Sequence, residues 1–165
     1  MPFTVLSACG KLPSWVVEGC ESYSKRLSRE YSLKWIDLPL VDRPKNKPVH
    51  QIKSAETARL VEAVPRSSYV IALDESGIAM STRKMADKVQ KCLVSNSSIC
   101  FVIGGPDGLD LELRETKNKR LSRPWADAVW SLSGLTFPHP MVRLLLVEQL
   151  YRVWSVNAGH PYHRD

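Results

Sequence analysis

Five short strand-like segments, separated by longer segments with helical spacing, constrain the fold of this chain more than any other feature. Four are largely apolar and span residues 3–9, 69–73, 98–103 and 128–132, and the fifth spans residues 33–38 and includes Lys34 and Asp37. Continuous rather than alternating hydrophobicity is typical of strands that are buried on both faces of a parallel sheet. The sequence therefore predicts an α/β fold, with a mainly parallel sheet, helices on both faces and a single domain over residues 1–165.

The segments between the apolar runs predict the helices. These cover residues 13–29, residues 49–64, a segment that begins at a Thr82 cap, residues 109–120, and a last helix between Pro140 and Gly159. Pro140 suits the first turn because its missing N–H would have no partner there, and Gly159 suits the end. Glu148 stands four residues before Arg152, which predicts an ion pair on one face of this helix. In the second helix, Glu56 and Arg59 are expected to be exposed.

The charge balance permits a polyanionic partner. The formal net charge is +6 and the pI is about 9.3, which is compatible with nucleic-acid binding but does not establish it. Residues 39–48 combine three prolines with Arg43, Lys45 and Lys47, so this stretch is a basic surface loop and a candidate RNA-backbone contact. A solvated connection explains it equally well.

Several classes of protein are disfavoured by what the sequence lacks. No apolar run approaches the roughly 20 residues that span a bilayer, and the first residues lack a basic n-region, so we expect a cytoplasmic protein without membrane contact. The cysteines form no CxxC pair, which favours buried, reduced thiols. His160 and His163 lack a carboxylate partner in a recognised metal pattern, so no metal site is expected.

Three of the predicted strands end in loops that are suited to a ligand, at Leu73–Asp74, at Gly104–Gly105 and at Ser133. In parallel sheets, ligands bind outside the carboxyl ends of the strands. Neither a Walker sequence nor the GxGxxG spacing is present, and Ser131 stands where a nucleophile elbow needs glycine. Taken alone, a tight structural turn is the commoner meaning of Gly-Gly-Pro, and Arg143 is more often part of a solvated helix face.

The combination of these motifs is more specific than any one of them. The sequences IGGPDG at residues 103–108, WSLSGLTFPHPMVR at 130–143 and HPYHRD at 160–165, with GKLPSW at 10–15, resemble the ribosomal RNA large subunit methyltransferase H family. The similarity covers essentially the whole chain. It implies a SPOUT-class methyltransferase that depends on S-adenosyl-L-methionine, has a deep C-terminal trefoil knot and works as a homodimer. The implied reaction methylates N3 of a pseudouridine in a 23S rRNA stem-loop on the assembled 70S ribosome.

The resemblance also assigns the site residues. The positions that match the three cofactor-binding loops are Leu73 and Asp74; Gly104, Gly105 and Gly108; and Ser133, Gly134, Leu135, Thr136, Phe137 and Pro138. The positions expected around the target base are His139, Arg143, Tyr162, His163 and Arg164. Departures from the family pattern at Asp107, Phe137 and Asp165 remove no reactive group.

The route of the N3 proton stays open at this point. His163 is a candidate base because histidine titrates near neutral pH. Alternatively, Arg143 or Arg164 stabilises the imide anion and water receives the proton. The tail is too short to reach far, so we expect the dimer partner to complete each site. The competing functions are a knotted tRNA methyltransferase and a non-catalytic ribosome-binding factor of the same fold.

Overall fold

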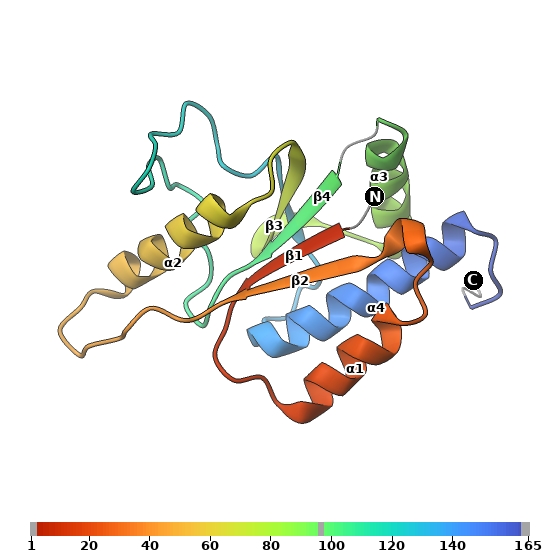
Figure 1. Ribbon diagram of the computed structural model, residues 1–165, viewed down its shortest axis with the longest axis horizontal. Coiled ribbons are helices and arrows are strands. Elements are labelled where there is room, and N and C mark those ends of the chain that lie inside the picture. Colours follow the sequence, from red (N-terminus) through yellow and green to blue (C-terminus); the bar gives the residue numbers. More distant parts are fainter. Residues whose placement is uncertain (1–2, 96–97, 163–165) are drawn as a thin grey trace.

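The computed structural model describes residues 3–95 and 98–162. Its centre is a five-stranded sheet in which every pair of neighbouring strands is parallel, in the order β2-β1-β4-β3-β5 (Figure 1). The strands are β1 (Phe3–Ala8), β2 (Leu33–Leu38), β3 (Ser68–Ala79), β4 (Ser98–Ile103) and β5 (Ala128–Ser131). This architecture confirms the predicted α/β class, and all five segments predicted as strands form strands.

Helices cover both faces of the sheet (Figure 1). They are α1 (Ser14–Ser24), α2 (Val49–Ala63), α3 (Thr82–Val94) and α4 (His139–Asn157), with a short 3-10 helix over Arg29–Tyr31. One buried core lies between the sheet and helices α3 and α4, which contribute Met85, Val89, Leu146 and Leu150. A second core lies on the other face, where α2 and the segment that follows β4 pack on the sheet.

The ends of α4 follow the sequence signals. Pro140 lies in the first turn, and Gly159 follows the helix with a φ of +64°, a conformation that glycine adopts without strain. The predicted pair of Glu148 and Arg152 is present. Among residues 3–95 and 98–162, no helix is both long enough and apolar enough to cross a membrane.

Strand β3 is longer than predicted. It leaves the β5 pairing after Leu73 and resumes it at Ile78, so both residues are opposite Trp130 and the chain between them forms a bulge. Gly77 allows this return, because a Cβ there would lie 2.7 Å from the Val129 carbonyl. The loop expected after Leu73 is therefore an excursion between two paired stretches of one strand.

The predicted helix over residues 109–120 is wrong. Asp110 turns the chain instead, accepting from the backbone N–H of Glu112 on its side chain and from that of Leu113 on its carbonyl. Leu113 and Trp125 are buried in the second core, and the Trp125 Nε1–H donates to the Asp110 carbonyl at 3.0 Å. Tertiary burial and side-chain contacts with the backbone thus replace the local helical periodicity.

Two helix boundaries also differ from the prediction. The first helix ends at Ser24 rather than near Arg29, and the 3-10 turn that follows buries Tyr31. The cap of α3 is Ser81, whose Oγ accepts from the Lys84 N–H at 3.2 Å, so Thr82 is the first helical residue.

The four cysteines are free thiols as predicted, although Cys92 is only half-buried. The trefoil knot stays a prediction.

We expect Trp125→Ala to lower the free energy of unfolding by about 3 kcal/mol, since it removes a buried indole and leaves a cavity. Trp15→Ala is the matched control, because that side chain is 52% exposed, and its loss should stay below about 1 kcal/mol. Urea denaturation followed by circular dichroism measures both. Equal losses for the two variants would show that residues 109–127 are not part of the core.

Candidate functional site

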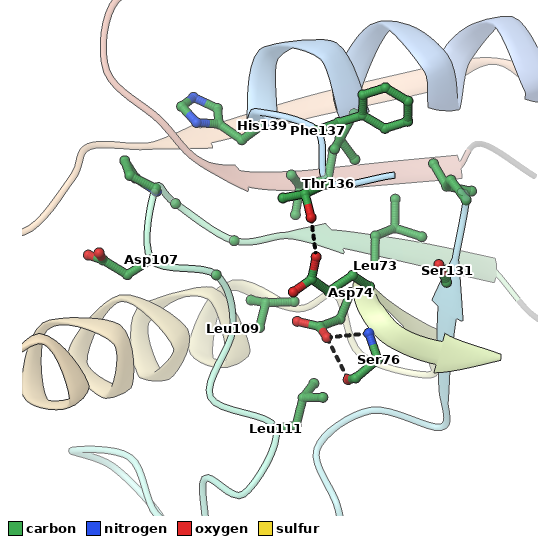
Figure 2. Close-up of a pocket in the computed structure, with 18 of the residues that line it drawn as sticks. Leu73, Asp74, Ser76, Asp107, Leu109, Leu111, Ser131, Thr136, Phe137 and His139 are labelled. Atoms are coloured by element: carbon green, nitrogen blue, oxygen red, sulfur yellow. Dashed lines mark hydrogen bonds between the residues drawn. The ribbon is translucent and has the colours of Figure 1, made fainter. Parts of the chain in front are cut away.

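A cleft of about 790 Å³ opens at the carboxyl ends of β3, β4 and β5 (Figure 2). Three loops form it: a first loop of residues 74–77, a second of residues 104–108 and a third of residues 132–138. They meet because the three strands are parallel neighbours, so their carboxyl ends share one edge of the sheet. The cleft brings together ten of the eleven residues predicted to bind the cofactor: Leu73, Asp74, Gly104, Gly105, Gly108, Ser133, Leu135, Thr136, Phe137 and Pro138. Gly134 is exposed in the third loop and does not line the cleft.

Close backbone contacts and a positive φ explain why the second loop contains glycine at these positions. A Cβ on Gly104 would lie 2.6 Å from the carbonyl carbon of Gly108. Gly108 itself has a φ of +80°, and its N–H donates to the Gly105 carbonyl at 2.9 Å. The loop is therefore a tight turn with bare backbone, which a ligand can approach closely. The Gly-Gly-Pro sequence is therefore both a tight structural turn and a stretch of backbone that a ligand can approach.

The first and third loops are joined across the cleft. The Thr136 hydroxyl donates to Glu75 Oε2 at 2.7 Å (Figure 2). Asp74 is held by its own loop, since its Oδ1 accepts from the N–H of Ser76 at 2.9 Å and from its hydroxyl at 2.6 Å. In the third loop, Ser133 Oγ accepts from the Leu135 N–H at 2.9 Å. Short polar side chains thus fix the loops around the space.

The lining of the cleft combines acidic and apolar side chains. Its carboxylates are Asp74, Glu75, Asp107, Asp110 and Glu112. Lys53 and His139 are the basic side chains of the lining, and Leu73, Leu109 and Phe137 are among the apolar ones. Coulomb attraction favours a ligand that carries positive charge and disfavours a polyphosphate. The apolar part suits an aromatic ring.

A buried carboxylate behind the second loop was missed from the sequence. Glu56 on α2 is only 2% exposed, so the prediction that it is exposed is wrong. Its Oε1 accepts from the Val41 N–H at 3.1 Å and from Arg43 at 2.8 Å, and Arg43 also pairs with Asp107 of the second loop. Oε2 faces Gly105, where a Cβ would lie 2.6 Å away. The Arg43 guanidinium, which comes from a loop outside α2, offsets the cost of burying the Glu56 charge.

This network also changes the reading of the basic loop over residues 39–48. Arg43 pairs with two carboxylates of its own chain, whereas Lys45 is exposed and Lys47 is half-buried. The RNA contact predicted for this loop therefore stays a prediction, and it concerns the two lysines. Arg43 instead ties the loop to the second loop of the cleft.

His139 begins α4 at the rim of the cleft. Burial lowers the pKa of its imidazole, the nearby Arg143 guanidinium lowers it further, and Glu56 partly opposes them. The ring is therefore predominantly neutral near neutral pH and has a free nitrogen lone pair, which can accept a proton.

Arg143 lies one turn further along α4 and does not line the cleft. It is 5% exposed and donates to both oxygens of Asp37, at 2.5 and 3.1 Å. Its Cζ stands 4.1 Å from the centroid of the Trp35 ring. Since Asp37 is near the carboxyl end of β2, this bidentate pair occupies the same edge of the sheet as the cleft. The catalytic role of Arg143 stays a prediction.

Tyr162 lies at the other end of α4. Its ring centroid is 4.5 Å from that of Tyr151, and the Arg152 Cζ is 5.4 Å from it. Tyr151 is twelve residues beyond His139 on α4 and thus about 18 Å further along the helix axis, so Tyr162 is remote from the cleft of its own chain and does not line it. His163 and Arg164 lie outside the described residues.

Some residues of the site had weak sequence signals or none. Glu75 could have been identified, because it directly follows Asp74 at a strand end. Lys53 and Glu56 lie inside a helix without a motif, and only the packing of α2 beside the second loop brings Lys53 to the cleft and Glu56 against Gly105. Arg43 resembled any exposed cation of a loop.

Comparisons with known proteins identify the family of this chain. A family model described as "Predicted SPOUT methyltransferase" matches residues 1–163. The chain belongs to the SPOUT methyltransferase family. The matched range includes the whole sheet, the three loops and α4.

Similar proteins carry the name "Ribosomal RNA large subunit methyltransferase H". The protein from Hydrogenovibrio crunogenus is 41% identical over 155 residues, which are 94% of each chain. The protein from Hahella chejuensis is 36% identical over the full length of both chains. The protein from Legionella pneumophila (strain Paris) is 37% identical over 99% of each chain.

No group of three or more His, Cys, Asp or Glu side chains in residues 3–95 and 98–162 is placed to hold a metal ion.

We expect Arg43→Ala to lower the free energy of unfolding by about 3 kcal/mol, because it leaves the buried Glu56 carboxylate without its cation. Lys45→Ala removes an exposed cation from the same loop and should change stability by less than about 0.5 kcal/mol. Chemical denaturation of both variants makes the comparison. If the two losses were the same, Arg43 would not compensate the charge of Glu56.

Proposed function

We propose that this protein is an S-adenosyl-L-methionine-dependent methyltransferase that acts on the ribosomal RNA of the large subunit. The finer proposal is that it methylates N3 of a pseudouridine in a 23S rRNA stem-loop on the 70S ribosome, in the cytoplasm. The observation that carries the proposal is the acidic cleft at three parallel strand ends, in a chain whose SPOUT relatives are named as large-subunit rRNA methyltransferases.

The cleft fits this cofactor chemically. S-adenosyl-L-methionine carries a sulfonium and an ammonium group, which suit the carboxylates of Asp74, Glu75 and Glu112. Leu73 and Phe137 offer apolar surface for the adenine ring, and the bare backbone of residues 104–108 and 133–138 offers hydrogen-bonding groups for its edge. When bound, the cofactor supplies an electrophilic methyl group on sulfur.

The protein's own task is to orient the target base and help N3 lose its proton. The methyl group passes from sulfur to N3, the N–H bond breaks, and the sulfur becomes neutral. His139 is neutral near neutral pH and lies at the rim of the cleft, so it is a candidate acceptor beside His163 or water. Arg143 stabilises negative charge on the base electrostatically, and Asp37 fixes the plane of its guanidinium.

A homodimer is part of the proposal. Tyr162 packs against Tyr151 on the half of α4 that is remote from the cleft, and His163 and Arg164 follow it directly. These two residues extend at most about 7 Å, which is short of the roughly 18 Å along the helix axis between Tyr151 and His139. The tail of one protomer therefore serves the cleft of its partner, where Tyr162, His163 and Arg164 meet His139 and Arg143.

The deciding experiment measures transfer of radiolabelled methyl from S-adenosyl-L-methionine to 70S ribosomes, free 50S subunits and bulk tRNA that lack the modification. We expect label in the 23S rRNA of 70S particles, at N3 of a pseudouridine when the digested nucleosides are analysed. Label in tRNA would support methyl transfer but would show that the substrate is tRNA rather than 23S rRNA. Absence of label together with absence of cofactor binding by calorimetry would favour a non-catalytic ribosome-binding factor.

We expect complementation between two inactive protomers. One lacks residues 160–165, and the other carries Gly104→Ala, which the Gly108 carbonyl carbon at 2.6 Å cannot accommodate. In a heterodimer purified with two tags, one site has an intact cleft and an intact tail, so about half of the wild-type activity returns, while each homodimer stays inactive. Heterodimers without activity would show that each site belongs to a single chain.

A further inference from the structure

A short basic hairpin leaves the sheet face that α2 covers (Figure 1). Its two arms are joined by an antiparallel bridge between Glu115 and Arg120. The Leu121 N–H donates to the Arg114 carbonyl at 2.7 Å, and the Thr116 N–H donates to the Lys119 carbonyl at 2.8 Å. Residues 114–121, here called the basic hairpin, thus have a defined backbone rather than the helix that the sequence predicted.

Positive charge is concentrated on this element. Residues 114–123 hold five cations and a single carboxylate, a net charge of +4 in a chain whose total is +6. At the base, Arg114 pairs with Glu112 and Arg123 pairs with Asp127. The three cations of the tip are all exposed; they are Lys117, Lys119 and Arg120. The positive charge of the tip therefore faces solvent.

The base of the hairpin is fixed to the core. Leu113 and Trp125 are buried on either side of it. Asp110 accepts from the Trp125 indole through its carbonyl, and its own N–H donates to Thr57 Oγ1 at 2.9 Å. Asp127 accepts from the Val70 N–H at 2.8 Å. The tip consequently projects from a rigid support, which reduces the entropy lost when it binds a partner.

The hairpin is also close to the cleft. Glu112 lines the cleft, and Lys117 is five residues further along the chain. Five extended residues span at most about 18 Å, so one RNA stem-loop is large enough to reach both places. None of the five carboxylates of the cleft lies on the hairpin, so a cationic ligand and a polyanion have separate surfaces.

We propose that the basic hairpin is a docking element for the phosphate backbone of the RNA that presents its nucleotide to the cleft. This rests on the proposed function, since the RNA is the substrate named there. The tip offers three cations together with the side-chain amide of the exposed Asn118, which are donors suited to phosphate oxygens. It has no exposed aromatic or large aliphatic side chain of the kind that anchors protein interfaces.

The test replaces Lys117, Lys119 and Arg120 by alanine in one variant. The matched control replaces Lys84, Lys88 and Lys91 of α3, which are also exposed cations and belong to the opposite face of the sheet, so both variants have the same net charge. A third variant exchanges Lys117 and Lys119 for arginine and Arg120 for lysine. Each is assayed for methyl transfer to 70S ribosomes and for filter binding of deproteinised 23S rRNA at several salt concentrations.

We expect the hairpin variant to raise KM for ribosomes about tenfold or more, with little change in kcat and unchanged cofactor affinity by calorimetry. The slope of log K against log salt for rRNA binding should fall by about three, one for each lost phosphate contact. The α3 variant and the charge-conserving variant should behave as the wild type, because the charge at the tip is what binds.

An unchanged KM and salt slope in the hairpin variant would overturn the inference and leave the proposed function intact. An equal loss in the α3 variant would also overturn it, because net charge alone would then explain the effect. Weaker binding to ribosomes with normal binding to deproteinised rRNA would mean that the hairpin contacts a ribosomal protein instead. If the wild type transfers no methyl group, the proposed function fails, and rRNA binding by the three variants still decides the role of the hairpin.

Discussion

Parallel pairing of β3 with both β4 and β5 is the constraint on which the rest of the structure depends. It places three carboxyl ends side by side, so loops that are far apart in the sequence enclose one cleft. The bulge in β3 adds to this, because the chain leaves the sheet after Leu73 and returns at Ile78. Asp74 and Glu75 are carried on that excursion, where they give the cleft much of its acidic character.

A second layer of organisation lies behind the cleft. Glu56 and Arg43 connect α2 and the proline-rich loop to Asp107 of the second loop. A buried carboxylate of this kind contributes little net stability by itself, but losing its partner is costly. The network therefore fixes the position of the second loop relative to α2. In contrast, Arg143 and Asp37 organise the β2 side of the same edge.

The sequence predicted the strands, and most of the loop residues that it singled out line one cleft, for a physical reason. Continuous apolar runs such as residues 98–103 suit strands that are covered on both faces of a parallel sheet, and the glycines at 104 and 108 meet local requirements of the backbone. The prediction over residues 109–120 failed because Leu109 and Leu113 have helical spacing, yet Asp110 and Trp125 hold the chain in a turn. The prediction that Glu56 is exposed was wrong because its partner, Arg43, lies in a loop outside α2.

The sequence by itself determined the α/β class, the ends of α4, the glycines of the second loop and the family resemblance, since these depend on local backbone preferences and on motifs. Only the tertiary structure decided that Glu56 is buried, that Arg143 engages Asp37, that Tyr162 is remote from the cleft of its own chain and that residues 114–121 form a hairpin. These features depend on contacts between segments far apart in the chain, and no local pattern encodes the distance between such segments.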